Sequence, residues 1–137
     1  MRIPALLKVP HKRIISDFVI DTGSPYTILN YSDSIRLNIP HTTKGEIIRI
    51  GGRTYQSYIF NKFEIILKTM DDKEITEIIP IRVLKPTSLK IDELRILDNL
   101  PNILGLDFLE KGYKLVCNIP EYDIYLEKDI EAGAKIR

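Results

Sequence analysis

Short runs of isoleucine and other β-branched residues limit the folds open to this chain more than any other feature. Paired isoleucines occur at residues 14–15, 47–48, 65–66 and 78–79. Each pair lies in an apolar run bounded by turn-forming or charged residues, and branched side chains in such runs favour β-strands. The chain is therefore predicted to be mostly all-β. We expect strands over residues 3–9, 14–21, 46–50, 54–60, 63–69, 74–84, 102–105, 113–118 and 123–127.

Turn residues separate most of these strands. Gly51-Gly52 supplies the positive φ angles that a tight hairpin needs. Residues 70–73 and 118–121 have the composition of two further turns. Three pairs of neighbouring strands are therefore expected to form hairpins.

One or two short helices are expected to interrupt the strands. Ser32 is a suitable N-cap for a helix over residues 33–37, and Asp107 is a suitable N-cap for one over residues 108–111. Residues 87–99 fit either an amphipathic helix or a structured loop.

Length and charge exclude several classes of protein. The chain has 137 residues, with 20 Lys and Arg against 19 Asp and Glu, so its formal charge is +1. This balance argues against a nucleic-acid partner, which requires a basic surface. The length fits a single domain over residues 1–137. We expect its core at about residues 14–127 and a charged, frayed tail at residues 128–137.

The sequence also carries expectations about the compartment. No apolar run approaches the roughly 20 residues that span a bilayer, and no signal peptide is visible. Cys117 is the single cysteine, so no intrachain disulfide can form. We expect a cytoplasmic protein without membrane insertion, in which Cys117 is a buried packing residue.

An acidic turn follows an apolar strand at Phe18-Val19-Ile20-Asp21-Thr22-Gly23-Ser24. A carboxylate at the end of a buried strand is costly unless hydrogen bonds stabilise it. We expect the Gly23 amide to donate to Asp21, and the Ser24 hydroxyl to reach the same oxygens. Asp-Thr-Gly arises by chance in roughly three of a hundred chains of this length, and the strand before it makes coincidence rarer. A hydrogen-bonded, partly desolvated aspartate suits acid–base catalysis.

A second motif is Asn102-Ile103-Leu104-Gly105-Leu106-Asp107-Phe108-Leu109, in which an apolar strand meets a glycine and passes into a short helix. Such a joint is common, and by itself it indicates little. Its position after the acidic turn, with a glycine hairpin between the two, makes the combination specific.

These motifs resemble those of the retropepsin-type aspartic proteases, the single-domain relatives of pepsin. The resemblance extends over roughly residues 14–127. It implies a small, closed β fold in which the Asp-Thr-Gly loop packs against the second motif and the glycine hairpin forms a flap over the substrate. It further implies an aspartic endopeptidase that cuts peptides or unfolded proteins bound as an extended strand.

The resemblance also assigns roles to particular residues. Asp21 would be the catalytic aspartate, and Thr22 would bind the loop of a partner subunit. Gly23 and Ser24 would support the carboxylate. The remaining residues that the resemblance implicates are Ile50, Gly51, Gly52 and Arg53 at the flap tip and Leu104, Gly105 and Asp107 in the second motif.

Aspartic peptidolysis requires two carboxylates that share a proton. The chain contains one Asp-Thr-Gly and no Asp-Ser-Gly. A catalytic Asp21 must therefore meet its copy across a two-fold axis, which predicts a homodimer and a bell-shaped pH dependence.

The sequence departs from the family pattern in three places. Pro25 follows Ser24 directly, and residues 87–99 are longer than compact viral members need. Arg53 suits an acidic or polar substrate side chain, although a solvated arginine is the simpler interpretation. Asp107 is a better helix cap than a catalyst.

Other chemistries find little support in the sequence. His11 and His41 have no further ligand at metal-binding spacing, so we expect no metal and no cofactor. Two alternatives to an endopeptidase stay open. One is a catalytically silent module of the same fold that binds peptides or dimerises, and the other is a structural β-domain without a site.

Overall fold

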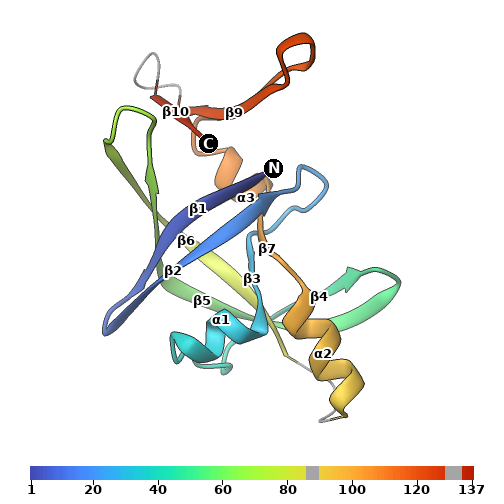
Figure 1. The fold of residues 1–137 in the computed structure, drawn as a ribbon. Helices are drawn as coiled ribbons and strands as arrows, with labels where there is room; N and C mark the ends of the chain where they lie inside the picture. The colour runs from blue at the N-terminus through green and yellow to red at the C-terminus, as the bar shows by residue number, and fades with distance from the viewer. Residues whose placement is uncertain (86–89, 129–133) are drawn as a thin grey trace.

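The computed structural model describes residues 1–85, 90–128 and 134–137, which form two β-sheets and short helices (Figure 1). The strands are β1 (Arg2–Val9), β2 (Lys12–Ile20), β3 (Ile28–Leu29), β4 (Lys44–Ile50), β5 (Arg53–Lys68), β6 (Glu74–Lys85), β7 (Asn102–Leu104), β8 (Tyr113–Asn118), β9 (Asp123–Lys128) and β10 (Ala134–Ile136). The helices are α1 (Tyr31–Arg36), α2 (Ile91–Asn99) and α3 (Leu106–Leu109), with a 3-10 turn at Ile119–Glu121.

The larger sheet closes on itself. Its strand order is β1-β2-β7-β3-β6-β5-β4, and β5 also pairs with β1. Leu6 of β1 lies opposite Ile15 of β2 on one side and opposite Ile66 of β5 on the other. Strands β1, β2, β7, β3, β6 and β5 therefore form a closed barrel. Strand β4 lies outside this barrel as one arm of a hairpin with β5. This confirms the expected all-β class and the closed fold.

Alternation along the strands fills the barrel. In β1 the side chains of Ile3, Ala5, Leu7 and Val9 point inward and are buried, as period-two geometry requires. A second, smaller apolar cluster lies beneath the β4–β5 hairpin. Its members are Ile28, Tyr55, Leu84 and Leu97, packed against Tyr26, Tyr31, Ile48, Ile50, Leu100 and Ile103.

One pair of predicted strands proves to be continuous. Residues 54–60 and 63–69 were expected as separate strands, and both lie in the single strand β5. The pairing with β6 shifts register between Phe60 and Phe63. A β-bulge lets a long strand bend around a barrel without ending, so the polar Asn61-Lys62 step is a bulge rather than a turn.

The helix starts differ from the predicted ones. The N-cap of α1 is Asn30, whose Oδ1 accepts a hydrogen bond from the Asp33 amide at 2.8 Å, so Ser32 is not the cap. Helix α3 begins at Leu106 with Gly105 as its N-cap, which places Asp107 inside the helix. Residues 91–99 are helical, and 87–89 lie outside the described residues. Within the described ranges, no helix is long and apolar enough to cross a membrane.

The smaller sheet has the order β10-β9-β8 and lies beyond the barrel, at the opposite end from α2 (Figure 1). The expected frayed tail is corrected here, because β10 pairs with β9 and Ile136 is fully buried in the main core. At the N-terminal end the core begins before residue 14, because β1 is a barrel strand whose inward side chains belong to the main core. Cys117 of β8 is exposed, so the expectation that it packs in the core is wrong.

Candidate active site

The two sequence motifs lie side by side. Strands β2 and β7 run parallel and their register ends with Ile20 opposite Leu104. Just beyond, the Asp21 amide donates to the Leu104 carbonyl at 3.0 Å, and the Leu106 amide donates to the Ser24 carbonyl at 2.8 Å. The Asp-Thr-Gly loop and the second motif are thus joined by their own backbones.

Gly105 makes this close approach possible. A Cβ at this position would lie 2.2 Å from the carbonyl oxygen of Tyr26 and 2.8 Å from that of Ser24. Both are backbone atoms of the loop that follows Asp21, so neither can rotate away. The expectation that Gly105 packs against this loop is confirmed.

Asp21 lies at the end of β2 and is exposed in the single chain. Its Oδ1 accepts a hydrogen bond from the Gly23 amide at 2.8 Å, as expected. The Ser24 hydroxyl, however, donates to the Tyr26 carbonyl at 2.7 Å, so the expectation that it reaches the carboxylate is wrong. Asp21 is therefore oriented by one backbone donor, and within the described part of this chain little shields it from water.

Thr22 is exposed beside Asp21. Its hydroxyl makes no hydrogen bond to any residue in the described ranges 1–85, 90–128 and 134–137. A threonine left in this state at the tip of an ordered loop is free to bind a second molecule.

Thr27 and Asp107 support the loop from behind. The fully buried Thr27 donates through Oγ1 to Asp107 Oδ1 at 2.7 Å and accepts from the Gly105 amide at 3.2 Å. Asp107 Oδ1 also accepts from the Phe108 amide at 2.8 Å. Asp107 therefore fixes the loop to α3, and it does not line the cavity that contains Asp21.

A buried polar network beneath the site was not anticipated. The Asp33 carboxylate accepts hydrogen bonds through Oδ2 from Ser16 Oγ at 2.6 Å and from Asn102 Nδ2 at 2.7 Å, and through Oδ1 from Arg36 at 3.0 Å. Asn102 also donates to the Asp17 carbonyl at 3.0 Å. The network joins α1 to β2 and β7, the strands that carry the two motifs. Asp33 and Arg36 are both on α1, but Ser16 and Asn102 lie on other elements, so no local pattern reveals the network.

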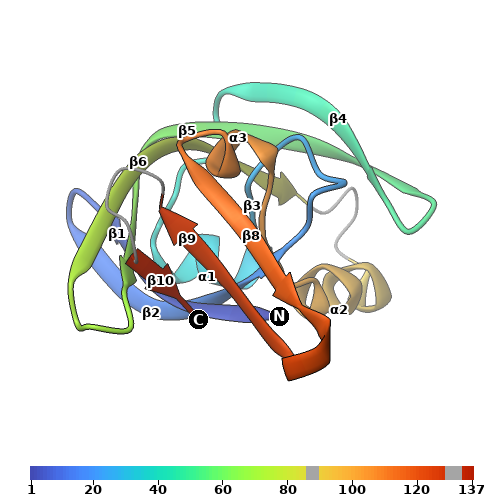
Figure 2. The same cartoon turned by 90° about the horizontal axis from the view of Figure 1, so that it is seen from above.

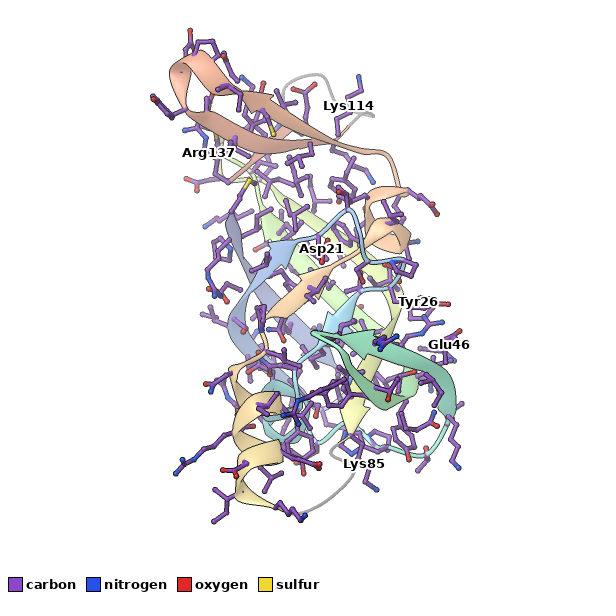
Figure 3. All side chains as sticks on the ribbon, turned by 90° about the vertical axis from the view of Figure 1, so that its right-hand side faces the viewer. Asp21, Tyr26, Glu46, Lys85, Lys114 and Arg137 are labelled. Carbon is purple, nitrogen blue, oxygen red and sulfur yellow. The ribbon has the colours of Figure 1, made fainter. Side chains whose placement is uncertain are left out.

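The β4–β5 hairpin lies across the cavity from the Asp-Thr-Gly loop that contains Asp21. Ile50 pairs with Arg53, and Gly51 and Gly52 form the tip with φ angles of 59° and 78°. Two positive φ values in a two-residue turn suit glycine. The hairpin predicted at Gly51-Gly52 is therefore confirmed, and Figure 3 shows its strand on the face of the molecule that carries Asp21.

The hairpin and the loop enclose a cavity of about 400 Å³ between them. It contains five of the predicted site residues, namely Asp21, Gly23, Ser24, Ile50 and Gly51. The other predicted residues do not line it: Thr22, Gly52, Arg53, Leu104, Gly105 and Asp107. Residues of the lining that sequence reasoning did not assign are Pro25, Tyr26, Ile28, Ile47, Ile48, Arg49 and Ile103.

The missed lining residues follow one pattern. Five carry apolar aliphatic or proline side chains, and the isoleucine pair 47–48 had already been recognised as part of a strand. Which face each isoleucine presents depends on strand register, which the sequence leaves open. The lining is therefore mostly apolar, with Asp21 and Arg49 as its charged residues.

A cluster of charge lies at the margin of this cavity. Arg82 of β6 donates through Nε and NH2 to the two carboxylate oxygens of Glu46 on β4, both at 3.1 Å. The Arg82 guanidinium also lies over the Tyr26 ring, 4.2 Å from its centroid. The hydrogen bond from Arg82 holds the pKa of Glu46 below its ordinary value. Among the described residues, no group of three or more His, Cys, Asp or Glu side chains could hold a metal ion.

The chain is similar to solved structures of a protease and of a protease-like domain. The retroviral protease-like domain of Ddi1 from Leishmania major matches with a TM-score of 0.55 at 12% identity, over 99% of this chain and 92% of that one. The EIAV protease complexed with the inhibitor HBY-793 matches with a TM-score of 0.46 at 17% identity, over 80% of this chain and 86% of that one. No protein-family model and no curated protein sequence matches the chain. The match to the Ddi1 domain shows that the chain has a retropepsin-like fold, so the resemblance drawn from its motifs is confirmed at the level of fold.

Proposed function

We propose that this chain, on its retropepsin-like fold, is an aspartic endopeptidase that acts as a homodimer. The observation that carries the proposal is the position of Asp21: it lies in one cavity with the tip of the β4–β5 hairpin, on a loop that the second motif fixes. The hairpin then serves as a flap over a substrate that lies against Asp21. Residues 1–137 act as one domain in this proposal.

The chemistry requires Asp21 and Asp21 of a second copy to share one proton. The ionised carboxylate removes a proton from water as the water oxygen attacks the peptide carbonyl carbon, and the protonated one donates to the carbonyl oxygen. The tetrahedral intermediate then collapses as a proton passes to the amine nitrogen and the C–N bond breaks. Rate is highest where the pair holds a single proton, so we expect a bell-shaped pH profile.

The cavity lining indicates the kind of substrate. Ile28, Ile47, Ile50 and Ile103 make much of the wall apolar, which favours apolar side chains next to the bond that is cut. A chain laid between the hairpin and the loop has to be extended. We therefore expect cleavage of unfolded proteins and peptides at apolar positions.

The small sheet offers a surface for the second copy. Tyr113, Leu115 and Cys117 share one face of the β8–β9 hairpin with Leu126 and Ile124. Near the barrel this face is buried, but towards the tip Leu115 and Ile124 are 39% and 40% exposed. The apolar face is thus longer than the barrel it covers, and Figure 2 shows the hairpin reaching past the barrel strands. We propose that this overhang packs against the second copy.

The test is cleavage of casein, an unfolded protein, by the wild type and by Asp21→Asn from acid to neutral pH. Asparagine keeps the acceptor for the Gly23 amide, so the variant should fold and dimerise as the wild type does. Asp72→Asn, at an exposed turn in the left-handed region, is the matched control. We expect cleavage by the wild type and the control and none by Asp21→Asn.

Two results would overturn the proposal. If a folded wild-type dimer cleaves no unfolded substrate, the fold serves as a catalytically silent module that binds peptides. If Asp21→Asn cleaves as fast as the wild type, the activity does not belong to this site.

A further inference from the structure

Glu46, Arg82 and Tyr26 connect three parts of the molecule that meet at the cavity. Glu46 lies on the hairpin strand β4, Arg82 on the barrel strand β6, and Tyr26 on the loop that follows Asp21. Figure 3 shows Tyr26 and Glu46 near each other beside the hairpin. The sequence separates them widely, and only the fold brings them together.

The guanidinium of Arg82 is used on both its edge and its face. Its edge makes two hydrogen bonds of 3.1 Å to the Glu46 carboxylate, and its face covers the Tyr26 ring at 4.2 Å. A planar fork that pairs with a carboxylate and stacks on an aromatic ring is a geometry that lysine cannot reproduce. The Arg82 side chain is only 12% exposed, against 43% for Glu46, so the guanidinium is shielded from water while the carboxylate stays in contact with it.

The local backbone explains why β4 needs this contact. The pairing of β4 with β5 shifts register between Lys44 and Ile47, so Glu46 falls in an irregular part of the ladder. There the Glu46 carbonyl accepts from the Ser57 hydroxyl. Strand β4 is the outermost strand of its sheet, with β5 as its neighbour. The Glu46–Arg82 pair therefore supplies a connection from β4 to the barrel that bypasses β5.

The Glu46–Arg82 pair contacts residues on both sides of the cavity. Ile47 and Ile48 follow Glu46 directly and line the cavity from the hairpin side, while Tyr26 lines it from the loop side. Arg82 contacts both sides, through Glu46 and through the Tyr26 ring. A movement of the hairpin away from Asp21 has to break or stretch these contacts.

We propose that Glu46 and Arg82 are positioning residues that hold the β4–β5 hairpin over Asp21 and fix the Tyr26 wall of the cavity. The proposal rests on the proposed function for its effect on catalysis. The pair touches no reacting atom, so its loss lowers the affinity for substrate more than it slows the chemical step. Loss of the Glu46–Arg82 pair should therefore raise KM and change kcat only slightly.

The first experiment compares Glu46→Gln and Arg82→Lys with the wild type in casein cleavage. Each removes the bidentate ion pair, and we expect KM to rise roughly five-fold with kcat changed by less than about two-fold. The matched control is Glu64→Gln, since Glu64 pairs with Lys8 at 4.0 Å on another side of the barrel. The double variant Glu46→Arg with Arg82→Glu restores opposite charges and should recover part of the lost affinity. Equal KM values for Glu46→Gln, Arg82→Lys and Glu64→Gln would overturn the proposal.

The second experiment does not depend on activity. Hydrogen exchange is measured in the Asp21→Asn background, with and without Glu46→Gln, Arg82→Lys or Glu64→Gln. We expect faster exchange in peptides covering residues 24–28 and 42–57 for the first two variants and unchanged exchange for Glu64→Gln. If the wild type proves inactive on casein, this result still decides whether the pair holds the hairpin. Unchanged exchange in both Arg82→Lys and Glu46→Gln would overturn it.

Discussion

Gly105 carries the tightest steric demand among the residues of the site. A methyl group there would meet two backbone carbonyls at 2.2 and 2.8 Å, so the loop after Asp21 and the second motif would be forced apart. We predict that Gly105→Ala destabilises the fold by about 3 kcal/mol, at the upper end for overpacking a rigid site. Urea unfolding measures this. Leu106→Ala, at the neighbouring exposed residue, is the control, and a loss from Gly105→Ala no larger than the control's would contradict the prediction.

His41 makes stability depend on pH. It stacks near Tyr31 with ring centroids 5.9 Å apart and lies 5.8 Å from the ring of Tyr58. Burial, and then the charge of Lys85, lower the pKa of His41 below its ordinary 6.5. The unfolded chain therefore binds the proton more readily. The contribution of His41 to stability is complete above about pH 6.5 and is lost as pH falls through the lowered pKa.

Replacing His41 should therefore flatten the pH dependence. We predict that the free energy of unfolding of the wild type falls from about pH 7.5 to about pH 5 more steeply than that of His41→Gln. Urea titrations of both proteins at several pH values measure the difference. Parallel curves would show that another group is responsible.

At the level of single residues, the sequence predicted only those site residues that lie in a contiguous motif. Asp21 and Gly105 each lie in a contiguous motif whose residue types indicate their surroundings. The structure has Asp21 at the end of an apolar strand and Gly105 packed against its loop, as predicted. Glu46 and Arg82 carry no such motif, because their relation depends on the register of three strands. Ser24 was assigned to the carboxylate, and only the structure revealed the nearer acceptor, the Tyr26 carbonyl.

At the scale of elements, the tip of the β4–β5 hairpin can be varied without touching the core. A Cβ on Gly51 or Gly52 would meet nothing within 4 Å, but both residues have positive φ angles. We predict that Gly51→Asn keeps activity, because asparagine accepts this conformation. Gly52→Val strains the turn and should lower kcat/KM roughly ten-fold with little change in Tm. Casein kinetics and thermal melts measure the two effects.

A contrary result would be equally clear. If Gly52→Val cleaves casein as well as Gly51→Asn does, the conformation of the tip does not matter to substrate binding, and the hairpin is not a flap.

Most strands were predictable because β-branched runs and turn residues indicate them directly, whereas β3 and β10 were not predicted. Helix starts were harder to predict: Asn30 caps α1, and its own amide donates to Asn102 Oδ1 across the fold at 2.7 Å, a contact that no local pattern reveals. The tail was misjudged for a similar reason: its charge suggested fraying, yet Ala134 and Ile136 alternate with polar residues as a strand does and find a partner in β9. Tertiary pairing overrode composition in both places.

For the whole molecule, the proposed dimer would account for two features of the single chain, the exposed Asp21 and the overhanging apolar hairpin. In the proposed mechanism Asp21 shares a proton with its copy, and the second copy would shield the exposed parts of Leu115 and Ile124 from water. The partner's loop would also give the Thr22 hydroxyl a hydrogen-bond partner. In a two-fold dimer each copy would supply the same patch to the other.

We therefore predict that activity per chain falls on dilution as dimers dissociate. Ile124→Lys places a charge on the overhang without disturbing the core, and it should raise the dimer dissociation constant about ten-fold or more. Ile78→Lys, at a residue 59% exposed on β6, is the matched control. Sedimentation and casein cleavage, measured over the same range of concentrations, should shift together for Ile124→Lys and not for Ile78→Lys. A rate per chain that stays constant while sedimentation finds monomers would mean that a single Asp21 suffices, which the shared-proton mechanism forbids.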